Sequence, residues 1–181
     1  MLFYAKSLSW QEWKEQMILI ALGANLNSAA GVPAQTLDAA LAEVARHGAR
    51  VVAVSPYYVT PAWPDPADPP YINAVARIES DESPQSLMEL LHATETAFGR
   101  TRAAKNAPRT LDLDLIDFDG RVEQGPPMLP HPRLTERAFV LVPLADVAPD
   151  WIHPVSGASV QDLLAALPPD ARKIARLTRS A

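Results

Sequence analysis

Residues 109–115 read Arg-Thr-Leu-Asp-Leu-Asp-Leu, a stretch in which leucine alternates with aspartate. Successive side chains of a β-strand point to opposite faces of the sheet, so the pattern predicts a strand over 110–119. Its leucines would face a core, and Asp112 and Asp114 would share the other face, about 6.5–7 Å apart at Cα. The same pattern is also typical of an amphipathic edge strand whose acidic face is solvated.

Basic residues gather in the sequence around this acidic strand. The candidates for contacts with an anion are Arg100, Arg102, Lys105, Arg109, Arg133 and Arg137. Neighbouring carboxylates repel each other, whereas a guanidinium forks onto phosphate oxygens. The combination therefore suggests bound phosphates, with Mg²⁺ between them and the carboxylates. No G-x-x-x-x-G-K-[ST] motif is present, so side chains rather than a glycine-rich loop would hold the phosphates.

The composition is that of a single globular domain of 181 residues with a formal net charge of −5. This acidic balance argues against a general nucleic-acid surface, although it leaves room for a local basic pocket. The chain has no cysteine, which excludes disulfides, thiolate nucleophiles and cysteine-ligated metal centres and fits a reducing cytoplasm. No apolar run approaches the ~20 residues of a membrane span, so no membrane partner is expected.

The first sixteen residues do not share the pattern of the rest, and residues 17–181 are predicted to form one domain. We expect residues 1–16 to be a mobile extension, because chain termini are ordered only where something ties them down. The helical spacing of Trp10, Trp13 and Met17 leaves a short amphipathic helix as the alternative.

From residue 17 onward, strand and helix signals alternate. Strands are predicted over 17–23, 50–60, 71–79 and 110–119, and helices over 33–46, 84–98 and about 159–167. Pro56 makes part of the second strand an edge or a bulge, and five prolines within residues 61–70 predict a stiff loop. The order β-α-β-β-α-β predicts the α+β class: a ferredoxin-like sandwich with an antiparallel sheet, both helices on one face, and a C-terminal extension.

Two residues of the third predicted strand could hold an aromatic ligand. Tyr71 and Asn73 share a strand face, which places a flat ring beside an amide that could read the edge of a heteroaromatic ring. The first expectation for Tyr71, Trp63, Phe139 and Trp151 is that they are core aromatics. His131, between two prolines, is first expected to be a structural hydrogen-bonding group.

Five blocks of the sequence occur together in a recognisable order. They are LGANL (22–26), TPAW…PPYINAV (60–75), Gly99-Arg100-x-Arg102, PRTLDLDL (108–115) and LPHPRLTERAFVLVPL (129–144). With these blocks the chain resembles the 6-hydroxymethyl-7,8-dihydropterin pyrophosphokinases of folate biosynthesis, from about Met17 to about Gly157. The resemblance implies a ferredoxin-like fold and the transfer of the pyrophosphoryl group of ATP to the pterin hydroxymethyl oxygen, with release of AMP.

The resemblance also implies roles for individual residues. Asp112 and Asp114 would bind two Mg²⁺ ions and, with Arg100 and Arg109, form the catalytic group. The residues implied to lie along ATP are His92, Glu95, Arg100, Arg102, Arg109, His131 and Arg137. Those implied to bind the pterin are Thr60, Pro61, Trp63, Tyr71, Asn73, Asp112 and Phe139, with the two rings of Tyr71 and Phe139 on either side of it.

The chain departs from the family pattern at two places: Asn106-Ala107 stands where the family often has Trp-Gly, and Pro126-Pro127-Met128 stands where it allows Arg-x-Thr.

The expected partners are ATP and the reduced pterin alcohol, with no nucleic acid and no membrane, and the protein is expected to be a cytoplasmic monomer. Two other functions are weighed: transfer of a phosphate or nucleotide to a different acceptor, and RNA binding by aromatic residues on the sheet. The acidic charge weighs against the second.

Overall fold

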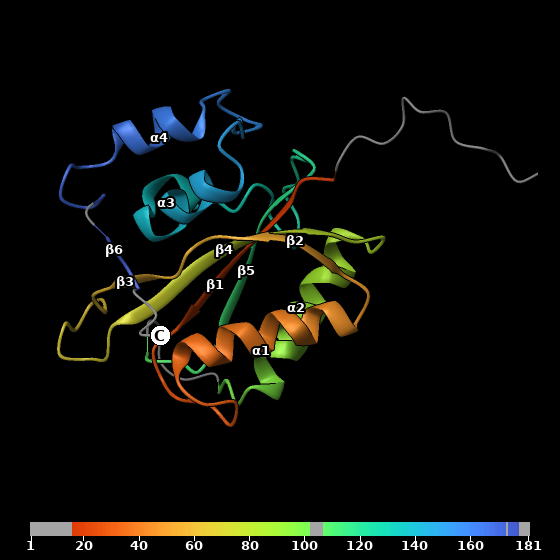
Figure 1. The fold of residues 1–181 in the computed structure, drawn as a ribbon. Helices are drawn as coiled ribbons and strands as arrows, with labels where there is room; N and C mark the ends of the chain where they lie inside the picture. Colours follow the sequence, from red (N-terminus) through yellow and green to blue (C-terminus); the bar gives the residue numbers. More distant parts are fainter. Residues whose placement is uncertain (1–15, 102–106, 173, 178–181) are drawn as a thin grey trace, which may run out of the picture.

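The computed structural model describes residues 16–101, 107–172 and 174–177, and Figure 1 shows their fold. The strands are β1 (Ile18–Ala24), β2 (Arg50–Val54), β3 (Tyr58–Thr60), β4 (Tyr71–Glu79), β5 (Asp112–Phe118) and β6 (Ala175–Arg176). The helices are α1 (Pro33–Arg46), α2 (Pro84–Ala97), a short 3₁₀ helix (Leu134–Glu136), α3 (Ala138–Val147) and α4 (Val160–Ala166).

One antiparallel sheet organises the molecule. Its strand order is β5-β1-β4-β3-β6, and β2 also pairs with β4. The central strand β1 pairs antiparallel with β4 and β5, which puts Gly23 opposite both Asn73 and Asp112. The predicted α+β, ferredoxin-like arrangement is confirmed, and the strands and helices before residue 120 begin and end within two residues of the predicted bounds, apart from the strand over 50–60.

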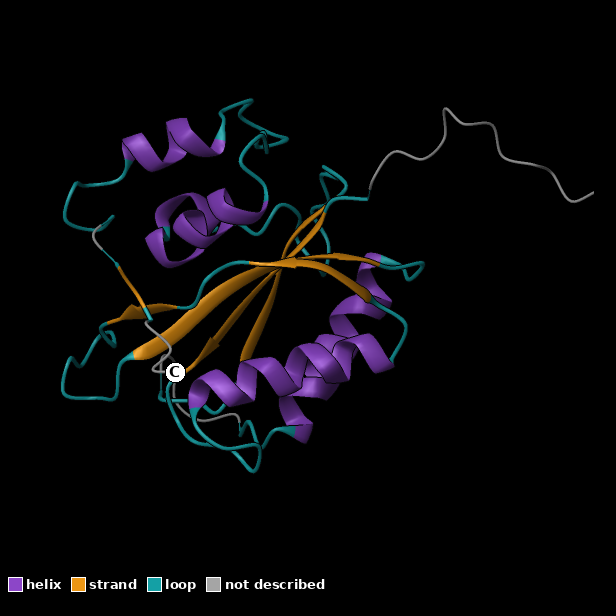
Figure 2. Ribbon diagram, in the orientation of Figure 1, coloured by secondary structure: helices purple, strands orange, loops and turns teal. Residues whose placement is uncertain are grey.

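Helices α1 and α2 cover one face of the sheet, as Figures 1 and 2 show. Pro33 occupies the first turn of α1, where its missing N–H costs nothing. Ser83 caps α2 by accepting a hydrogen bond of 3.1 Å from the backbone N–H of Ser86. The apolar stripes of both helices pack with the leucines of β5, Leu113 and Leu115, in one buried cluster.

The C-terminal extension covers the opposite face, so the sheet lies between two helical layers (Figure 2). Val140, Leu141 and Leu144 of α3 are buried in a second cluster with Leu19 and other side chains of the sheet. The sequence pattern did not predict this packing. Nearly every side of α3 is apolar, so it shows no polar face from which a helical period could be recognised.

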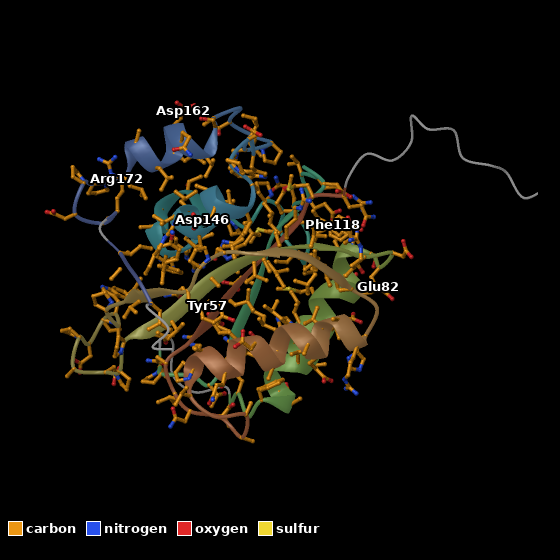
Figure 3. All side chains as sticks on the ribbon, viewed as in Figure 1. Tyr57, Glu82, Phe118, Asp146, Asp162 and Arg172 are labelled. Carbon is orange, nitrogen blue, oxygen red and sulfur yellow. The ribbon has the colours of Figure 1, made fainter. Side chains whose placement is uncertain are left out.

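The predicted second strand is divided at Pro56 into β2 and β3, with a register shift between Val51 and Ala53. Ser55 bridges the break, because its backbone and its hydroxyl both bond to Val75. Beyond the break, Tyr57 donates to Asp38 of α1 (2.6 Å) and Tyr58 donates to Asp146 of α3 (2.7 Å). Figure 3 labels Tyr57 beside the sheet and Asp146 on α3. Tyr57, just before β3, and Tyr58, its first residue, thus tie this part of the sheet to both helical layers.

The predicted N-terminal extension lies, up to residue 15, outside the described residues. Gln16 and Met17 are attached to the domain: the Gln16 side chain accepts from the N–H of Ser80 (3.0 Å), and the Met17 N–H donates to Asp119 (2.8 Å). Among the helices that the structure describes, none is long and apolar enough to cross a membrane.

Candidate functional site

The acidic pair lies on the sheet face that α3 partly covers. Asp112 and Asp114 are half-buried there, with side chains 29% and 31% exposed, while Leu113 and Leu115 point into the core under α1 and α2. The alternation of leucine and aspartate thus separates the two faces of β5. One face of β5 packs against α1 and α2, and the other carries the two carboxylates near the start of the strand.

Three guanidinium groups from different segments surround these carboxylates. Arg100, after α2, contacts Asp112 at 2.6 Å, and Arg109, before β5, contacts it at 3.1 Å. Arg137, at the start of α3, lies 3.2 Å from Asp114. These contacts offset the repulsion between the carboxylates, and they concentrate positive charge where a polyanion could bind.

A third carboxyl group is joined to the pair through Arg100. Glu95 of α2 is only 5% exposed; it contacts Arg100 and accepts a 2.7 Å hydrogen bond from the backbone N–H of Leu113. Burial raises the pKa of Glu95 to about 7, because loss of solvation outweighs the Leu113 N–H and the positive charge of Arg100. His92 lies one turn earlier on α2 and is exposed.

His131 faces the second carboxylate. Its Nε2 lies 4.0 Å from Asp114, and its backbone N–H donates to the carbonyl of Ile116 at 2.8 Å. Burial lowers the pKa of the His131 ring, even though the negative charge of Asp114 favours the protonated form. The ring Nδ1 accepts from the N–H of Arg133 (3.1 Å). His131 thus faces Asp114 from a turn in which both of its neighbours in the sequence are prolines.

The expected pterin residues of β3 and β4 lie together. Asn73 is buried and donates from Nδ2 to the hydroxyl of Thr60 at 2.8 Å. Tyr71 is half-buried, and its hydroxyl donates to the carbonyl of Ala107 at 3.4 Å. Sequence analysis missed Gly23, which lies between this group and Asp112. A Cβ on Gly23 would lie 3.2 Å from Asn73 Oδ1 and 3.9 Å from both Asp112 Cβ and Tyr71 Cδ1.

Gly23 therefore leaves open space that a side chain would take. The signal that could have found it is a lone glycine inside a strand pattern, which often marks a close approach of another group to the backbone. A flat ring lying over Gly23 would have the amide of Asn73 on one side and the carboxylate of Asp112 on the other.

The remaining expected pterin residues are more exposed. Phe139, at the start of α3, is 38% exposed, and the Arg137 guanidinium lies 5.6 Å from its ring centre. Trp63 is 70% exposed and Pro61 is also exposed, both in the proline-rich loop. Among the described residues, no ring-to-ring contact joins Trp63 or Phe139 to Tyr71. Arg102, expected along ATP, lies outside the described residues.

A groove of about 740 Å³ lies beside this site but is not formed by it. It is lined by Asn25, Leu26, Asn27, Val32, Pro33, Ala34, Pro69, Pro70, Ile72 and Leu177. None of the carboxylates or arginines above is among them. Ile72 has the opposite strand parity to Tyr71 and Asn73, so the groove opens on the α1 side of the sheet.

The donor set fits magnesium bound together with phosphates. Mg²⁺ prefers oxygen ligands and usually takes one or two carboxylates, with water and substrate phosphates completing its shell. Asp112 and Asp114 provide such a pair, half-exposed and flanked by anion-binding arginines. Within the described ranges no group of three or more His, Cys, Asp or Glu side chains forms a metal cage, so the protein alone does not supply a complete shell.

The fold is similar to that of a Plasmodium falciparum protein whose structure is titled "HPPK-DHPS wild type". The TM-score is 0.60 at 12% sequence identity, and the similarity covers 82% of this chain and 44% of that chain. This chain thus spans less than half of the Plasmodium protein. At such low identity the likeness shows the fold alone.

Sequence comparison gives the family. Three relatives described as 2-amino-4-hydroxy-6-hydroxymethyldihydropteridine pyrophosphokinase match most of this chain. The one from Synechocystis sp. is 41% identical over 81% of this chain and 73% of its own length. The relative from Pseudomonas aeruginosa is 40% identical over 84% of this chain and 93% of its own length. The relative from Methylorubrum extorquens is 37% identical over 83% of this chain and 92% of its own length. Because residues 19–149 also match its family model, the chain belongs to the 7,8-dihydro-6-hydroxymethylpterin-pyrophosphokinase (HPPK) family.

Proposed function

We propose that Asp112 and Asp114 bind two Mg²⁺ ions in the reaction of this family. In that reaction the enzyme transfers pyrophosphate from ATP to 6-hydroxymethyl-7,8-dihydropterin, giving AMP and the pterin diphosphate of folate biosynthesis. The observation that supports the residue roles is the arrangement of β5: two carboxylates on one face, with Arg100, Arg109 and Arg137 in contact with them.

Charge is the main obstacle to this reaction. A primary alcohol must attack the β-phosphorus of a polyanion, and catalysis of such transfers consists mostly of positioning and electrostatic stabilisation. Bound Mg²⁺ would neutralise phosphate charge and hold the triphosphate against the two aspartates. Arg100 and Arg109 already lie at Asp112, where they can turn to the negative charge that develops in the transition state.

The other ATP residues extend from this centre. We propose that Arg137 and His131 bind the nucleotide beside Asp114, and that Arg102, Glu95 and His92 bind it beside Arg100. The ion pair between Arg137 and Asp114 and the approach of His131 support the first pair. The contact of Glu95 with Arg100 supports the second group.

The pterin is proposed to lie over Gly23, between β4 and β5. Asn73 would hydrogen-bond the edge of the ring, and Asp112 would face the end that carries the hydroxymethyl group. The bond from Asn73 to Thr60 fixes the orientation of the amide before the ligand arrives. We propose that Tyr71 and Phe139 stack on the ring, and that Pro61 and Trp63 close over it when the proline-rich loop moves.

We further propose that the protein works as a cytoplasmic monomer on these two small molecules and without nucleic acid. The net charge of −5 and the absence of cysteine support this proposal.

The test is the identity of the adenylate product. Purified protein is incubated with ATP, Mg²⁺ and the reduced pterin alcohol, and the nucleotides are separated by chromatography. AMP should appear only with the pterin present, and excess EDTA should stop its formation. ADP would indicate a phosphotransferase instead, and pyrophosphate a nucleotidyltransferase.

The metal role is tested with Asp114→Ala. This variant should lose turnover while keeping the wild-type circular dichroism spectrum, because the half-exposed side chain is not part of the core. The matched control is Asp81→Ala, an exposed aspartate beyond the opposite end of β4, which should keep wild-type activity. Normal turnover of Asp114→Ala would contradict the metal assignment.

A further inference from the structure

Asn25 is a buried amide in a loop. It follows β1 directly, in the segment that leads to α1, and is only 3% exposed. A polar side chain buried in this way must find hydrogen-bond partners. Asn25 finds them on two segments far away in the sequence, 84 and 44 residues from it.

Its first partner is the backbone of Arg109. Asn25 Oδ1 accepts from the Arg109 N–H at 2.8 Å, and the Asn25 N–H donates to the Arg109 carbonyl at 3.1 Å. The N–H of Leu26 donates to the same carbonyl at 3.2 Å. Both backbone groups of Arg109 are therefore held, and the guanidinium extends towards Asp112 from a fixed origin.

Its second partner is the end of the proline-rich loop. Asn25 Nδ2 donates to the carbonyl of Pro69 at 3.0 Å. Pro69 stands two residues before Tyr71, at the entry to the strand that carries Asn73. One side chain thus links the segment that carries Arg109 to the segment that enters the expected pterin strand.

Two side-chain hydrogen bonds of Asn25 make this link. The groove of about 740 Å³ is lined by both Asn25 and Pro69, so open space lies beside their contact. An amide suits both partners at once, since it offers an acceptor to the Arg109 N–H and a donor to the Pro69 carbonyl. A carboxylate of the same shape would keep the acceptor, lose the donor and set negative charge against the Pro69 oxygen.

We propose that Asn25 is a positioning residue that couples the placement of Arg109 to that of the pterin-binding strand. The inference rests on the proposed function, in which Arg109 stabilises charge during transfer. Asn25 touches neither substrate in this scheme. It acts through the backbone of Arg109 and the carbonyl of Pro69.

The experiment is a double-mutant cycle between Asn25→Asp and Arg109→Ala, with kcat and the KM for each substrate measured. In the wild-type background, Asn25→Asp should lower kcat by about 10-fold or more, because misplaced catalytic groups lose that much. In the Arg109→Ala background the same change should cost less than about 3-fold, because no guanidinium is left to misplace. The control is Asn27→Asp, an exposed asparagine of the same loop, which should keep wild-type kinetics.

Two results would overturn the inference: an unchanged kcat in Asn25→Asp, or equal losses in both backgrounds. If Asn25→Asp does not give the wild-type circular dichroism spectrum, Asn25→Ala takes its place under the same criteria, since it removes both contacts without adding charge. Normal turnover of Arg109→Ala alone would refute the proposed role of Arg109, and this inference with it. That outcome is distinct from equal losses in both backgrounds and leaves the proposed reaction itself standing.

Discussion

Replacing Glu95 by glutamine is expected to change how the stability of the protein depends on pH. The carboxyl group is buried, and burial raises its pKa from 4.5 to about 7. Between these two values the unfolded chain releases the Glu95 proton while the folded chain retains it. The folded state then binds more protons, so the free energy of unfolding falls as the pH rises through this window.

The size of the effect follows from the shift. A rise from 4.5 to about 7 corresponds to about 3 kcal/mol at about 1.4 kcal/mol per unit of pKa. The contribution of the Glu95 proton to the free energy of unfolding is fully present below pH 4.5 and is lost above about pH 7. Between pH 5 and pH 8 the free energy of unfolding of the wild-type protein should therefore fall by about 2 to 3 kcal/mol because of this one group.

The assay is urea unfolding of the wild type and of Glu95→Gln across this pH range. Glutamine can still accept from the Leu113 N–H but does not titrate, so the difference between the two curves isolates the carboxyl group. Glu89→Gln, an exposed position on the same helix, is the matched control and should follow the wild type. Parallel curves for wild type and Glu95→Gln would refute the reasoning, because they would mean that Arg100 fully compensates the burial of Glu95.

Two substitutions in the proposed substrate site are expected to separate binding from chemistry. Arg109→Ala should lower kcat by orders of magnitude with little change in KM, because the guanidinium is proposed to act mainly in the transition state. Steady-state kinetics that show a change in KM alone would count against that role. Gly23→Ala should raise the KM for the pterin about 10-fold, worth about 1.4 kcal/mol, since its Cβ would lie 3.2 Å from Asn73 Oδ1. The KM for ATP should stay unchanged, and equal effects on both substrates would place the pterin elsewhere.

Much of the fold could be predicted because local signals and packing agree. Pro33 and Ser83 mark the starts of α1 and α2, and the alternation at Asp112 and Asp114 separates the two faces of β5. The second helical layer could not be predicted in this way. α3 carries Pro143 inside it and is buried on most sides, so neither composition nor period distinguishes it from a strand or a loop.

The site was predictable only in part, for a similar reason. Motif residues with charges, such as Asp112 and Arg109, stand out in the sequence, whereas the contributions of Gly23 and Asn25 depend on contacts across the sheet. Asn25 bonds to Arg109, which lies 84 residues later in the sequence, and a periodic pattern cannot predict such a long-range hydrogen bond. A lone asparagine in a turn-rich segment reads first as a turn residue.

The strand that carries Asp112 and Asp114 is also an edge of the sheet, since β5 is outermost in the strand order. Unpaired backbone groups on such a border can recruit a strand from another molecule. Here Glu95 occupies the N–H of Leu113, and the N–H of His131 occupies the carbonyl of Ile116. Two backbone groups of this edge are therefore already bonded within the chain and cannot pair with a strand from another molecule.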